Sequence, residues 1–126
     1  MRALRHIAIV MAMFVMIGEL YRSWGDGRHI IWVLDDIFAG LFMLYAAAAF
    51  TDDTPVRRAV FAGAWGVAVG MLYMSFFSSF LSPDTTNSGN LDLKLLIAAK
   101  GVLFAGSIAC LILSIKLPYH RSLPHE

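Results

Sequence analysis

Charge is scarce in this chain. Lysine, arginine, aspartate and glutamate together make up 15% of its 126 residues, whereas an ordinary soluble domain has roughly 25%. Hydrophobic residues make up 59%, and a chain this short has too little interior to bury so much apolar surface. We therefore expect the surplus to face lipid, which argues against a soluble enzyme, a nucleic-acid-binding protein and a disordered regulator.

Cysteine is equally scarce. The single cysteine, Cys110, excludes an intramolecular disulfide and a multi-cysteine metal site. The formal net charge of +1 provides no strongly basic or acidic surface for a highly charged partner. The sequence also lacks a glycine-rich phosphate loop, a nucleophile elbow and a His-Glu-x-x-His motif. We therefore expect neither an enzyme nor a bound metal or cofactor, and no nucleic-acid partner.

Four long apolar stretches are what the chain does contain. A membrane-spanning helix needs about 20 mostly apolar residues, and four stretches qualify, at about 4–21, 29–50, 56–81 and 91–115. The segments between them are short and contain glycine or proline, and short connections favour antiparallel neighbours. The sequence thus predicts an all-α, four-span antiparallel transmembrane bundle, forming one domain over residues 1–116.

The distribution of lysine and arginine predicts the orientation. One side of the expected bundle holds most of these residues, namely Arg2, Arg5, Arg57, Arg58, Lys116 and Arg121. The other side holds Arg22 and Arg28, with Lys94 at the interface. Because cytoplasmic segments carry the excess of positive charge, we expect both termini in the cytoplasm, with residues 117–126 as a short tail. A bacterial inner membrane fits this multi-pass arrangement.

The polar residues inside the predicted spans gather at one depth. Glu19, Asp35, Asp36 and Lys100 all lie nearer the outer ends of their helices, and the third span adds serines at the same level. The inner halves of the spans, 7–17, 37–50, 59–70 and 101–115, carry no formal charge. A charge at the bilayer centre costs at least about 2.5–3.5 kcal/mol. We therefore predict a polar vestibule that opens outward above an apolar plug.

Helical geometry suggests which charges meet. Lys100 can pair with Asp36 or Asp35, and Glu19 can pair with Arg22 one turn further on. Asp35 and Asp36 point about 100° apart, so they cannot both face one partner. We predict that Asp36 faces inward, since it shares a face with Gly40, and that Asp35 faces the interface or another subunit. The alternative is structural, with Lys100 snorkelling to the headgroups and the glutamate in an ordinary interfacial ion pair.

Small residues recur at four-residue spacing in the last two spans. Gly66 and Gly70 follow this spacing in the third span, as do Gly101 and Ala105 in the fourth. Such grooves let helix backbones approach closely in membranes. The pattern predicts helix packing at these positions, either within the bundle or between copies of the chain.

Two functions from different classes fit these features. The first is an oligomeric channel or carrier for a small ion or solute, bound by Asp36, Lys100, Asp35 and Glu19. The alternative is a non-transport membrane subunit that binds a partner protein or a lipid for assembly, stability or sensing. A membrane enzyme that uses the carboxylates as acid and base is a weaker third possibility, because the sequence offers no nucleophile and base at a matching spacing.

Overall fold

The protein is all-α. The computed structural model describes residues 1–25, 27, 29–51 and 54–117, and this part of the chain contains helices and no strand. The four long helices are α1 (Arg2–Ser23), α2 (Ile30–Ala49), α3 (Pro55–Leu81) and α4 (Leu93–Lys116), with a short 3-10 turn, η1 (Pro83–Thr85), after α3. Each predicted apolar stretch corresponds to one helix. Apart from Leu117, the tail expected at 117–126 lies outside the described residues.

Local sequence signals set the helix ends. Pro55 opens α3, where its missing N–H has no helical partner to lose. The preceding Thr54 accepts a hydrogen bond from the backbone N–H of Arg57 at 3.3 Å. Asp92 caps α4 in the same way, by accepting from the backbone N–H of Leu95 at 3.0 Å. These caps place two of the helix starts that the sequence pattern predicted.

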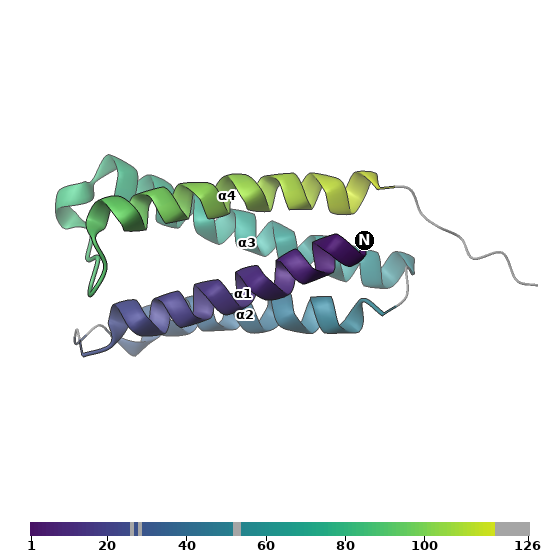
Figure 1. Ribbon diagram of the computed structural model, residues 1–126, viewed down its shortest axis with the longest axis horizontal. Helices are drawn as coiled ribbons and strands as arrows, with labels where there is room; N and C mark the ends of the chain where they lie inside the picture. Colours follow the sequence, from purple (N-terminus) through teal and green to yellow (C-terminus); the bar gives the residue numbers. More distant parts are fainter. Residues whose placement is uncertain (26, 28, 52–53, 118–126) are drawn as a thin grey trace, which may run out of the picture.

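The helices pack as two hairpins (Figure 1). α1 lies along α2, α3 lies along α4, and the hairpins meet mainly where α2 contacts α3. The start of α1 and the end of α4 lie at the same end of the bundle, which we call the terminal end. The end of α1 and the start of α4 lie at the other, which we call the loop end.

The main core fills the terminal end. Phe61 and Trp65 of α3 are fully buried there, with their rings edge to face and their centroids 6.1 Å apart. Phe50 packs on Phe61. Buried alanines of α1, α2 and α3 complete the cluster, together with the larger side chains of Leu4, Met43 and Cys110. The small alanine side chains allow helices to pack closely at this end. The result is an apolar cluster that joins the four helices at this end.

The outer surface of the helices is apolar. Large hydrophobic side chains such as Val10, Val56 and Val102 are mostly exposed. Three of the helices, α1, α3 and α4, are long and apolar enough to cross a membrane. An exposed apolar surface of this extent suits lipid rather than water, so the fold is consistent with a membrane protein.

The connection between α3 and α4 docks on the end of α1. The backbone N–H of Asn90 donates to the carbonyl of Arg22 at 3.2 Å, and its side-chain amide donates to the carbonyls of Tyr21 and Trp24 at 3.0 and 2.8 Å. The neighbouring Gly89 has a φ of +57°, and a Cβ there would overlap the Arg22 carbonyl. Only glycine fits both conditions at this position.

This contact predicts that Gly89→Ala destabilises the bundle. The added methyl group would push the connection away from α1, and the positive φ would add strain, so we expect a loss of about 1–3 kcal/mol. The free energy of unfolding in detergent micelles measures it. Gly25→Ala is the matched control, because Gly25 has a φ of +73° with open space around it. An equal loss in both variants would contradict a role for close approach.

Candidate functional site

An open polar cavity of about 820 Å³ occupies the loop end. Side chains of both charge signs line it, and they come from all four helices and from the α3–α4 connection. The charged and polar members are Arg22, His29, Asp35, Asp36, Ser75, Ser78, Ser79, Thr85, Thr86, Asn87 and Lys100. The bundle is therefore divided into a filled apolar end and a hollow polar end.

A buried ion pair lies beside the cavity. The Glu19 carboxylate is 2.7 Å from an Arg22 guanidinium nitrogen, and the side chains are 4% and 8% exposed. The Ser23 hydroxyl donates a further hydrogen bond of 2.8 Å to the glutamate. All three residues belong to the last two turns of α1, at spacings that put them on one helix face. The predicted pairing of Glu19 with Arg22 is thus present, but it is buried.

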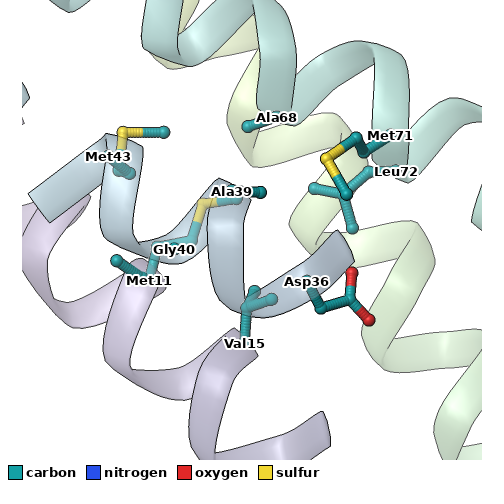
Figure 2. Close-up of a pocket in the computed structure, with 10 residues that line it drawn as sticks. Met11, Val15, Asp36, Ala39, Gly40, Met43, Ala68, Met71 and Leu72 are labelled. Carbon is teal, nitrogen blue, oxygen red and sulfur yellow. The ribbon is translucent and has the colours of Figure 1, made fainter. Parts of the chain in front are cut away.

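Asp36 of α2 joins this pair. Its carboxyl lies near that of Glu19, and it is also within the field of the positive charges of Arg22 and Lys100. Figure 2 shows Asp36 at one end of a small hollow of about 30 Å³, with Met43 at the far end. The other residues around this hollow are apolar. Asp36 therefore stands at the boundary between the polar cavity and the apolar region.

Lys100 approaches the cavity from α4. Its ammonium donates to the Ser79 hydroxyl at 2.7 Å and to the Ser75 carbonyl at 3.3 Å. The buried Ser79 hydroxyl in turn donates to the same carbonyl at 2.9 Å. Serines one turn apart on α3 thus hold the lysine head at the cavity wall. Sequence reasoning noted serines at this depth but did not assign them as partners of Lys100.

The two aspartates diverge, as their adjacent positions require. Asp36 faces inward, on the same face as Gly40, where a Cβ would collide with the side chain of Met16. Asp35 is exposed and lines the mouth of the cavity. The structure thus brings together Glu19, Asp36 and Lys100 and leaves Asp35 at the edge.

An apolar groove beside Asp35 was not foreseen. It measures about 430 Å³ and lies between α2 and α3, lined by Asp35, Phe38, Ala39, Phe42, Val67 and Met71. The sequence does hold a signal for it, since residues 35, 38 and 42 lie on one helix face at spacings of three and four.

The small residues differ in their surroundings. A Cβ at Gly101 would lie 3.0 Å from a ring carbon of Phe76, so this glycine packs closely against α3. Gly66 and Gly70 have open space within 4 Å, and Ala105 is exposed. Of these four small residues, only Gly101 lies at a close contact with another helix of the same chain.

Comparison of the chain with known protein families, curated proteins and solved structures gives no match. In the part of the chain that the structure describes, no group of three histidine, cysteine or acidic side chains could hold a metal ion.

The buried charges predict an asymmetry between two variants. Arg22→Gln leaves the Glu19 and Asp36 carboxyls facing each other, and removing one partner of a buried pair costs about 3–5 kcal/mol. Glu19→Gln should cost less, because Arg22 keeps Asp36 as a neighbour. Chemical unfolding of the purified protein in micelles measures both. Equal losses, or a larger loss in Glu19→Gln, would contradict this view of the cluster.

Proposed function

We propose that the protein is a small membrane carrier or channel for a small ion or solute, which binds in the cavity at the loop end. One observation carries the proposal. Arg22, Asp36 and Lys100, contributed by three helices, line one open cavity above an apolar core, and the buried Glu19 pairs with Arg22 beside it. Ionisable groups at membrane depth mark substrate or ion pathways by default. The filled core favours a carrier, since passage would require it to rearrange.

The membrane arrangement is part of the proposal. α2 acts as the fourth span, since its 20 residues match the length needed. The loop end faces outward and the terminal end faces the cytoplasm, because Arg2, Arg5, Arg57, Arg58 and Lys116 lie at the terminal end. Both termini are then cytoplasmic, and a bacterial inner membrane suits this orientation.

The proposed working form is a homo-oligomer. A single four-helix bundle is too slim to enclose much of a pathway. Gly66 on α3 and Ala105 on α4 do not pack closely within the chain, so their small surfaces can meet a second copy.

A non-transport subunit is the second candidate. The cavity opens at one end, and the core that closes the other end would serve only as an anchor. In that case the polar groups would hold a partner protein or a lipid headgroup, and no flux would occur.

Transport predicts that two cavity variants stop flux while the fold survives. Asp36→Asn and Lys100→Gln should each lower uptake by proteoliposomes about tenfold or more, since a charge that contacts the solute is removed. The probes are radiolabelled rubidium, chloride and betaine, which represent a cation, an anion and a zwitterion. Lys94→Gln is the matched control, because Lys94 is an exposed lysine on the same helix that does not line the cavity.

Circular dichroism of each variant verifies the fold. Uptake that equals that of protein-free liposomes for all three probes, and also for the quaternary cation tetraethylammonium, would overturn the transport proposal and favour the second candidate. Equal uptake by the wild type and both cavity variants would show that any pathway bypasses the cavity.

The oligomer predicts a contrast between two neighbouring positions on α4. Ala105→Leu should lower the oligomer mass seen by native mass spectrometry, because the larger side chain would separate the two copies, while the chain itself stays folded. Gly101→Leu should instead lower the stability of each chain, because the leucine would collide with Phe76. A wild-type protein that is monomeric in mild detergent would contradict the oligomer.

A further inference from the structure

Among the described residues, the carboxylates at the cavity differ in their partners. Glu19 is paired with Arg22, and Asp36 lies within the field of both Arg22 and Lys100. Asp35 is different, since among the described residues its carboxylate has no hydrogen-bond or ion-pair partner. Of the lining carboxylates, it is the one that an incoming positive charge can reach without breaking an existing pair.

The same carboxylate borders the apolar groove. Asp35 and Met71 line both the polar cavity and the groove of about 430 Å³ between α2 and α3. Phe38, which is 64% exposed, and Phe42 form the aromatic part of the groove. This face would meet the hydrocarbon of the outer leaflet in the proposed orientation. The groove and the cavity thus join at a single negative charge.

We infer that this joined site binds an amphipathic monocation, an amine or quaternary onium group attached to an apolar body, which enters sideways from the bilayer. The onium group lies at Asp35 and the apolar body lies in the groove, where the phenylalanine rings offer cation–π and apolar contact. A second positive charge is disfavoured, because Arg22 and Lys100 line the same cavity. The inference rests on the proposed function, in which this molecule is the transported solute.

The test measures binding and does not depend on flux. Isothermal titration calorimetry follows tetraphenylphosphonium added to the full-length protein in detergent micelles. We expect saturable binding by the wild type and a weakening of about tenfold or more in Asp35→Asn, since the ion pair is lost. Asp84→Asn should bind as the wild type does, because Asp84 is an exposed carboxylate outside the lining residues. Asp35→Glu should restore most of the affinity.

Two further measurements test the chemical class. Tetraphenylborate has the same shape with the opposite charge, and it should not bind. Phe38→Ala should weaken tetraphenylphosphonium binding severalfold, whereas Phe80→Ala, which removes another exposed phenylalanine outside the groove, should not.

Several results would overturn the inference. They are no binding by the folded wild type, equal binding by Asp35→Asn, or equal binding of tetraphenylborate. A co-purified zwitterionic phospholipid that is lost in Asp35→Asn, without tetraphenylphosphonium binding, would show that the site holds a lipid instead. Flux of rubidium, chloride or betaine without onium binding would overturn this inference alone. Onium binding without any flux would overturn only the proposed transport.

Discussion

The buried pair of Glu19 and Arg22 is the interaction on which the loop end depends. The Arg22 guanidinium offsets the negative charge of Glu19, and its field also reaches Asp36. This positive charge allows the two carboxyls to lie near each other in a low-dielectric setting. The backbone carbonyl of Arg22 also receives the N–H of Asn90. Arg22 therefore compensates the charge of a buried carboxylate and also holds the α3–α4 connection through its backbone carbonyl. A change at Arg22 would affect both the charges and the shape of the cavity.

The contrast between the two ends follows from side-chain size and charge. At the terminal end, buried alanines let α1 and α2 approach while Phe61 and Trp65 fill the space between the hairpins. At the loop end, carboxylates, an ammonium group and serine hydroxyls replace them, and such groups need hydrogen-bond or ion-pair partners when they are buried. The hairpins are thus in contact along part of their length and separated by a hollow along the rest.

The sequence alone predicted the features that depend on one helix, namely where a helix begins and which way a side chain faces. Periodicity placed Asp36 on the face of Gly40 and directed Asp35 elsewhere, and Pro55 marked a helix start. Contacts between helices were harder, because they depend on how each helix is rotated against its neighbour. Lys100 was expected to meet an aspartate, and its ammonium also donates to Ser79 of α3, a partner that the sequence pattern did not assign. The same holds for Gly66 and Gly70. Their four-residue spacing predicts a groove on α3, but it does not predict which helix packs into that groove.

The free-energy cost of burying these charges bears on the function of the protein. Replacing a buried ion pair by well-packed apolar residues is often neutral or stabilising, and an apolar cluster already closes the terminal end of this bundle. Continuing that cluster to the loop end would give a simpler anchor. The chain instead keeps Arg22, Asp36 and Lys100 around a hollow, with Glu19 beside them, and leaves Asp35 where the hollow meets exposed phenylalanines. The proposed site for an amphipathic cation would account for both features.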